Sequence, residues 1–168
     1  IEIYKYARRK GLLVTIFTNG SMITPQIVDE LVALPPEFVE ITIYGATSET
    51  YEKVTRVPGS FERCMKGINL LLEKGIKTKL KTMVLDINIH EYEAIRSIAE
   101  RLGVEFRHDA ILWPRLDHDP KNIEHQIPIE DVLRLENRTD EQRAEWSRIE
   151  ESFSGKTSRT GKVFNCGA

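Results

Sequence analysis

The sequence predicts an α/β fold built on a parallel sheet. Four short runs are rich in β-branched and aromatic residues, and they alternate with segments in which apolar residues recur at helical spacing. Strands that are separated by full helices need right-handed crossovers and therefore run parallel, as in a barrel or a doubly wound sheet. A chain of 168 residues is long enough for one such domain.

The first unit starts with a helix rather than a strand. Residues 1–10 have helical spacing and stop at Gly11, because glycine tolerates the left-handed conformation past a helix end. Residues 12–18 form a β-branched run that closes with an Asn-Gly turn. Thr24, followed by proline, then supplies an N-cap for a helix that reaches Leu34.

The second unit repeats this order. Residues 38–44 predict a short strand, and a polar stretch over residues 45–59 follows it. Ser60 is the expected N-cap of the next helix, whose apolar residues recur at helical spacing until Gly75.

Two more strands complete the expected sheet. Residues 77–85 form the third, and the helix after it is expected to be capped by Asn88, with Glu91 three residues on. Gly103 follows that helix, and residues 104–113 form the fourth strand.

The chain changes character after Pro114. Residues 115–126 read as a polar loop, and one or two very polar helices are expected within residues 128–151. We expect three parts, which are the α/β units at 1–113, an appended loop and helices at 114–152, and a linker at 153–168.

Composition narrows the class of protein. With 24 basic and 26 acidic residues the net charge is −2, which gives no electrostatic reason to expect a nucleic-acid partner or a polybasic membrane contact. The apolar runs are far shorter than the roughly 20 residues that span a bilayer. Two cysteines, Cys64 and Cys166, are too few for a disulfide framework. We therefore expect a cytoplasmic protein without a membrane partner.

Several common catalytic motifs are absent from the sequence. Gly155-Lys156-Thr157 lacks the upstream glycine of a phosphate-binding loop, because Glu150 stands at that position. The sequence also has no G-x-G-x-x-G after a strand, no G-x-S-x-G and no H-E-x-x-H.

Two polar groups remain as candidates from the residues alone. Asp117, His118 and Asp119 offer ligands for a divalent metal, with a solvated loop as the alternative. Alternating lysines of the third strand share one face, and Lys81 lies nearest the carboxyl end, where parallel sheets bind ligands. Two interpretations stay open for the Lys81 ammonium group: it binds the carboxylate of a ligand, or it lies at a partly solvated edge of the sheet.

The strand ends resemble those of radical SAM enzymes, most closely those with a C-terminal SPASM region. The resemblance rests on Thr18-Asn19-Gly20, on residues 41–45 (ITIYG) and on residues 48–61 (SETYEKVTRVPGSF), and it covers nearly the whole chain. Thr42 and Tyr44 stand where the family has Ser and Asp. The resemblance implies a partial (β/α) TIM-like barrel of parallel strands, truncated at both ends.

The resemblance also implies S-adenosylmethionine and a [4Fe–4S] cluster as cofactors. The threonine hydroxyls would meet the cofactor, the Asn-Gly turn would let backbone approach it, Arg56 would meet a carboxylate, and backbone near Trp113 would meet adenine. Cys166 resembles the first SPASM cysteine, a ligand of auxiliary [4Fe–4S] clusters, whereas Cys64 matches no ligand position and is expected to be buried. The expected cofactor contacts are Thr18, Asn19, Gly20, Thr42, Tyr44, Arg56, Lys81 and Trp113.

The family's C-x-x-x-C-x-x-C loop and Gly-Gly-Glu-Pro segment are not in this sequence. We therefore expect an inactive fragment of an enzyme that cleaves S-adenosylmethionine reductively and abstracts a substrate hydrogen, with a peptide or protein as substrate. Two alternatives stay open. One is a non-catalytic scaffold of the same fold, suggested by Tyr44 in place of Asp, and the other is a metal-dependent barrel that uses Asp117, His118 and Asp119.

Overall fold

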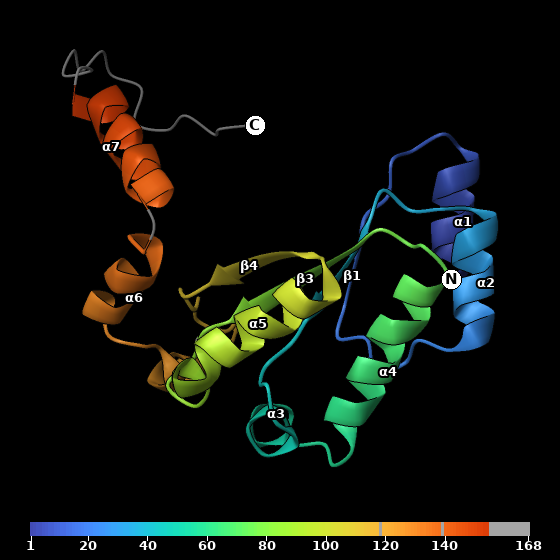
Figure 1. The fold of residues 1–168 in the computed structure, drawn as a ribbon, viewed down its shortest axis with the longest axis horizontal. Helices are drawn as coiled ribbons and strands as arrows, with labels where there is room; N and C mark the ends of the chain where they lie inside the picture. The colour runs from blue at the N-terminus through green and yellow to red at the C-terminus, as the bar shows by residue number, and fades with distance from the viewer. Residues whose placement is uncertain (118, 139, 155–168) are drawn as a thin grey trace. The chain divides into compact units, whose positions relative to one another are not determined.

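The four expected strands form one parallel sheet in the order β1-β2-β3-β4 (Figure 1). This computed structural model describes residues 1–117, 119–138 and 140–154. The α/β class and the parallel sheet with alternating helices are confirmed, consistent with a partial TIM-like barrel. The strands are β1 (Ile16–Thr18), β2 (Val39–Thr42), β3 (Thr78–Met83) and β4 (Glu105–Asp109).

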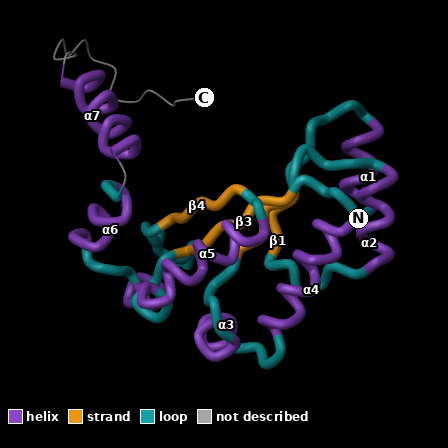
Figure 2. Tube along the Cα trace, viewed as in Figure 1, coloured by secondary structure: helices purple, strands orange, loops and turns teal. Residues whose placement is uncertain are grey.

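Helices alternate with these strands, as Figure 2 shows by colour. Thr24 caps its helix as expected, because its Oγ1 accepts a hydrogen bond from the amide of Ile27 at 3.4 Å. Gly11 and Gly103 both adopt positive φ just past a helix end. Up to residue 127, the helices are α1 (Glu2–Arg9), α2 (Pro25–Ala33), α3 (Ser48–Thr55), α4 (Ser60–Glu73) and α5 (Tyr92–Leu102). The same range contains the 3₁₀ turns η1 (Ile89–Glu91) and η2 (Pro120–His125).

Two expected N-caps are corrected. Gly59, at φ 70°, is the N-cap of α4, and Ser60 is its first residue, sharing a 2.8 Å hydrogen bond with the hydroxyl of Thr55. Asn88 precedes η1 but its side chain caps no helix, because its amide bonds to backbone groups at the ends of β2 and β3. The polar stretch at residues 45–59 also contains a helix, α3.

The core lies between the sheet and the helices. Alternate residues of β2 and β3 are fully buried there, and in register Ile41 pairs with Leu80. Helix α4 contributes Ile68 and Leu71, and α5 contributes Ile95, each at most 1% exposed. The opposite face of the sheet has a different composition. We name it the charged face, after Glu40, Lys79, Lys81, Glu105, Arg107 and Asp109.

The described chain divides into two units by its internal contacts. The first is Ile1–Ile127, and the second begins at Pro128 and contains α6 (Ile129–Glu136) and α7 (Asp140–Ser154). In the part of the chain that the structure describes, every helix is too short or too polar to cross a membrane.

Candidate functional site

A cavity of about 340 Å³ opens at the carboxyl ends of β1 and β2. Ligands of parallel α/β sheets bind at this end of the strands, because the loops that follow the strands converge there. We name it the strand-end cavity. It is lined by Asn19, Ser21, Tyr44, Tyr51, Val54, Thr55, Val57, Ser60 and Arg63. Two of the expected contacts, Asn19 and Tyr44, are therefore brought together.

The turn after β1 is fixed by its own side chains. The Oγ1 of Thr18 accepts a hydrogen bond from the amide of Gly20 at 3.2 Å. The Oδ1 of Asn19 accepts from both the amide and the hydroxyl of Ser21, at 3.1 and 2.8 Å. Polar side chains that bond backbone two residues on are typical of tight turns. Among the described residues, the side-chain Nδ2 of Asn19 has no acceptor, so its hydrogens can bind another group.

Gly20 is required at this turn for two reasons. Its φ is 74°, and a Cβ there would lie 3.2 Å from the Cγ2 of Ile41. Helix α4 also packs directly on the turn, because a Cβ on Gly67 would lie 2.3 Å from the carbonyl oxygen of Gly20. The two glycines therefore let α4 and the turn approach closely and fix one side of the strand-end cavity.

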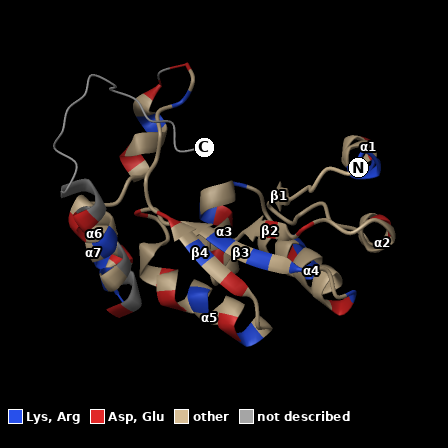
Figure 3. Ribbon diagram, turned by 90° about the horizontal axis from the view of Figure 1, so that it is seen from above, with Lys and Arg blue, Asp and Glu red and all other residues tan. Residues whose placement is uncertain are grey.

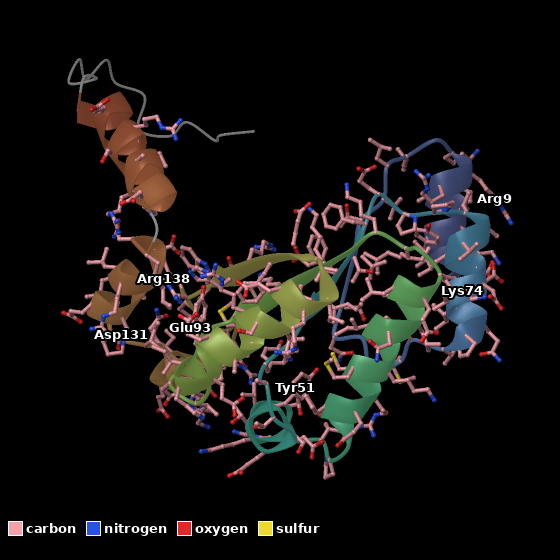
Figure 4. The ribbon with its side chains drawn as sticks, in the orientation of Figure 1. Arg9, Tyr51, Lys74, Glu93, Asp131 and Arg138 are labelled. Carbon is pink, nitrogen blue, oxygen red and sulfur yellow. The ribbon has the colours of Figure 1, made fainter. Side chains whose placement is uncertain are left out.

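Two tyrosine rings lie together at the cavity. Tyr44 follows β2 and Tyr51 lies on α3, labelled in Figure 4, and their ring centroids are 5.9 Å apart in a T-shaped contact. Burial raises the pKa of each phenol, so both hydroxyls are neutral donors at pH 7. Tyr44 therefore cannot supply the charge that a carboxylate would supply there.

Cys64 lies behind this pair and is fully buried, as expected. Burial raises the pKa of its thiol, although the hydrogen bond from Tyr51 acts in the opposite direction. A thiol that stays protonated is a poor ligand for iron, so Cys64 is a packing residue.

The guanidinium group that lines the cavity belongs to Arg63. It lies in the first turn of α4, and its Nη2 donates to the carbonyl oxygen of Pro58 at 3.1 Å. Arg56, the residue expected to meet a carboxylate, is exposed and ends α3 at φ 58°. Thr55 and Val57 on either side of it line the cavity, but Arg56 does not. Sequence reasoning missed Arg63, because no signal in the sequence separates it from Arg56.

Thr42 and Lys81 lie outside the strand-end cavity. They are register partners in β2 and β3, and the ammonium of Lys81 forms an ion pair with Asp109. Lys79 forms an ion pair with Glu105, and Arg107 forms one with Glu40. Figure 3 shows acidic and basic residues side by side on these strands. Lys81 is therefore already neutralised by a carboxylate of its own chain.

The loop after β4 does not contribute to the lining of the strand-end cavity. Trp113 is 80% exposed, and its carbonyl oxygen accepts from Asn122 at 2.7 Å. Asp117 forms an ion pair with Arg115, and Asp119 caps η2. His118 lies outside the described residues, as does Cys166. Across 1–117, 119–138 and 140–154, no three His, Cys, Asp or Glu side chains gather as a metal site.

Comparison with known proteins gives a consistent result. The model of the Radical SAM superfamily matches residues 1–99. The AdoMet-dependent heme synthase of Methanosarcina barkeri is 34% identical over 113 residues, which is 67% of this chain and 32% of that protein. The Fe-coproporphyrin III synthase of the same organism is 29% identical over 99 residues, or 59% of this chain and 25% of that protein. The mycofactocin maturase MftC of Mycobacterium tuberculosis is 28% identical over 107 residues, or 63% and 27%.

Proposed function

Because the chain belongs to the radical SAM superfamily, we propose that its strand-end cavity binds S-adenosylmethionine for a radical SAM enzyme. The observation that carries this proposal is the cavity itself, which joins the carboxyl ends of β1 and β2 and is lined by a guanidinium, an amide, hydroxyls and two aromatic rings. The chain spans about a third of the length of the heme synthase, 32%, so the activity of a whole protein is also part of the proposal.

The residues of the cavity fit the chemistry of this cofactor. An Arg63 guanidinium is suited to a carboxylate, because its parallel N–H groups match the two oxygens. Asn19 and Ser60 offer hydrogen bonds to hydroxyls or ring nitrogens. The faces of Tyr44 and Tyr51 offer apolar contact and attract a sulfonium cation. We assign the carboxylate to Arg63 in preference to Arg56, since only Arg63 lines the cavity.

The other expected contacts have separate roles in this proposal. Thr18 and Gly20 shape the turn rather than reach the ligand with a side chain. Thr42 and Lys81 would meet cofactor or substrate only on the charged face. Trp113 would contribute backbone near the adenine. These assignments are proposals that single substitutions test.

The described residues do not fit an iron–sulfur cluster. Such clusters need several thiolates, and Cys64 is the cysteine within the described part, buried and protonated. We propose that the ligands of the [4Fe–4S] cluster lie in a longer protein. We also propose Cys166 as a ligand of an auxiliary cluster in a SPASM region.

The chemistry that the cofactor supplies in this family is reductive cleavage to a 5′-deoxyadenosyl radical that abstracts hydrogen from a substrate. The residues of this chain would hold the cofactor in one orientation and exclude water from its reactive end. In enzymes generally, holding the reacting groups in the correct orientation accounts for a large share of the rate enhancement. We propose that the strand-end cavity performs this positioning role.

For the substrate, a peptide or protein remains our proposal. It is supported by the similarity to a mycofactocin maturase. The similarity to a heme synthase, 34% over 113 residues, supports a tetrapyrrole as the second candidate. The two are separated by incubating the longer protein, reduced and loaded with cluster, with each class of substrate. Deuterium transfer from a labelled substrate into 5′-deoxyadenosine identifies the class that is used.

The proposal is tested with the anaerobically reconstituted longer protein. We expect a bound cluster and 5′-deoxyadenosine when dithionite and S-adenosylmethionine are added. A scaffold that has lost catalysis, the alternative suggested by Tyr44, gives no 5′-deoxyadenosine and no heat when S-adenosylmethionine is titrated. That result would contradict the enzyme hypothesis and favour the scaffold alternative.

A further inference from the structure

Two side chains from the loop after β3 hold the loop after β2. The first is Asn88, which is 1% exposed. Its Nδ2 donates to the carbonyl oxygens of Tyr44 and Met83, both at 3.0 Å, and its Oδ1 accepts from the amide of Leu85 at 2.8 Å. One amide group therefore joins the carboxyl ends of β2 and β3.

The second side chain is Glu91, whose carboxylate accepts four hydrogen bonds. Oε2 accepts from the amides of Ala46 and Thr47, at 2.7 and 3.2 Å. Oε1 accepts from the hydroxyls of Thr47 and Thr50, both at 2.7 Å. Hydrogen bonds to a charged acceptor are stronger than neutral ones, and a carboxylate is favoured at a helix N-terminus. Glu91 thus anchors the first turn of α3.

Neither side chain serves the helix that follows it in sequence. Helix α5 begins at Tyr92 without a side-chain cap bond, although Asn88 and Glu91 have the residue types and the spacing of a capping pair. The partners of Glu91 lie 41 to 45 residues earlier in the chain, and Asn88 reaches Tyr44, 44 residues earlier, besides its local bonds at the end of β3. Their polar groups therefore bind the segment that follows β2 instead of capping α5.

The segment that they hold, from the loop after β2 into α3, carries both tyrosines of the strand-end cavity. Gly45 packs so closely on α3 that a Cβ there would lie 2.6 Å from the amide nitrogen of Tyr51. Tyr44 precedes this contact and Tyr51 follows it, and both line the cavity. Because the loop and α3 are packed so closely, a shift of this segment would displace both rings.

We propose that Asn88 and Glu91 are positioning residues of the strand-end cavity, which hold Tyr44 and Tyr51 in place before a ligand arrives. This inference rests on the proposed function, since the ligand is taken to be S-adenosylmethionine. A preformed cavity binds more tightly than one that must be ordered, because the ordering entropy has already been lost on folding. Neither residue needs to touch the ligand for this effect.

The first test measures the loop itself, without any ligand. In Glu91→Gln, an amide replaces the carboxylate at nearly the same shape and keeps one oxygen as an acceptor. We expect amide hydrogen exchange over residues 44–51 to accelerate about tenfold, with exchange in β3 and α4 unchanged. The matched control is Glu100→Gln, on exposed α5 surface, whose carboxylate pairs with Arg96 at 3.0 Å. Exchange over residues 44–51 that is equal in both variants would overturn the proposal.

The second test separates positioning from folding in the reconstituted longer protein. We expect Glu91→Gln to raise the KM for S-adenosylmethionine about fivefold and Glu91→Ala about tenfold or more, while kcat for 5′-deoxyadenosine changes less than about twofold. A purely structural role would lower the active fraction, and hence kcat, and leave KM unchanged. That outcome would overturn the proposal, and Glu91→Gln keeps the test valid if Glu91→Ala fails to fold.

The two hypotheses fail in different ways. If the wild-type protein with its cluster does not bind S-adenosylmethionine, the proposed function fails, and the positioning role for this cofactor fails with it. If wild-type protein binds but Glu91→Gln and Glu100→Gln bind equally well, only the positioning role fails.

Discussion

Glu40 is buried at the centre of β2 and forms a two-point ion pair with Arg107 of β4, although β3 lies between these two strands. The Nε and Nη2 atoms of Arg107 donate to the two carboxylate oxygens at 2.8 and 2.7 Å. The side chain of Glu40 is 4% exposed and that of Arg107 is 48% exposed. The buried carboxylate of Glu40 therefore links β2 to β4 across the charged face.

Removing the cation of this pair should destabilise the fold. We expect Arg107→Met to lower the free energy of unfolding by about 1–3 kcal/mol, because it leaves the carboxylate of Glu40 buried without its partner. The exposure of the guanidinium keeps the effect below that of a fully buried pair. Urea unfolding measures it, with Arg96→Met on α5 as the control. Equal destabilisation by the two variants would contradict this account of Glu40.

The close approach of α4 to the turn after β1 gives a second prediction. In Gly67→Ala the new Cβ would lie 2.3 Å from the carbonyl oxygen of Gly20, so the helix or the turn must shift. We expect a loss of about 2–3 kcal/mol in the free energy of unfolding. Asn69→Ala, two residues on and exposed, should be neutral or slightly stabilising. A Gly67→Ala protein as stable as Asn69→Ala would show that the approach is looser than the structure indicates.

Cys64 should be chemically inert in the folded protein. It is fully buried and the pKa of its thiol is raised, and alkylation requires an accessible thiolate. We expect iodoacetamide to leave the peptide that contains Cys64 unmodified under native conditions and to modify it completely in denaturant, as read by mass spectrometry. Rapid modification of Cys64 in the native protein would mean that the packing behind Tyr51 opens readily.

The anchoring of α3 by Glu91 should depend on pH. Partial burial alone would raise the pKa of this carboxyl, but the hydrogen bonds from Thr47, Thr50 and Ala46 outweigh it and hold the pKa below its ordinary value of 4.5. The stabilisation is therefore complete above the unfolded-state pKa and is lost as pH falls through the lowered folded-state pKa.

The measurement compares the free energies of unfolding of wild type and Glu91→Gln between about pH 7 and about pH 3. We expect the difference between them to shrink toward the acidic end. The Nε2 of His90 lies 4.0 Å from the Glu91 carboxylate, so the comparison is repeated in a His90→Asn background, which removes this neighbouring imidazole. A difference that stays constant with pH in both backgrounds would contradict the depressed pKa.

Sequence reasoning recovered the four strands and the helices α1, α2, α4 and α5, but not α3, because the signals of the recovered elements are local. The cap at Thr24 and the glycines after α1 and α5 act within a few residues, so their meaning is visible along the chain. The same reasoning assigned Asn88 and Glu91 to a cap of their own helix. The partners of Glu91, and the Tyr44 carbonyl that Asn88 reaches, are more than 40 residues away in sequence, and the pairing of β2 with β3 brings them together.

Part of the candidate site could be predicted, because the residues that end a strand are visible in the sequence. Asn19 and Tyr44 follow strands whose ends meet at one edge, and both line the cavity. Choosing between Arg56 and Arg63 required the path of the backbone between α3 and α4, where Arg56 ends one helix in the left-handed conformation. Nothing in the spacing alone distinguishes the two arginines.

That choice also provides the most direct test of the central claim, which is that the strand-end cavity binds S-adenosylmethionine. Calorimetric titration of the cofactor into the reconstituted longer protein compares wild type with Arg63→Ala and Arg56→Ala. We predict that Arg63→Ala raises Kd by about tenfold or more, as for the loss of a charged hydrogen-bonding partner, and that Arg56→Ala binds like wild type. Equal affinity of Arg63→Ala and wild type would contradict the claim that this cavity binds the cofactor.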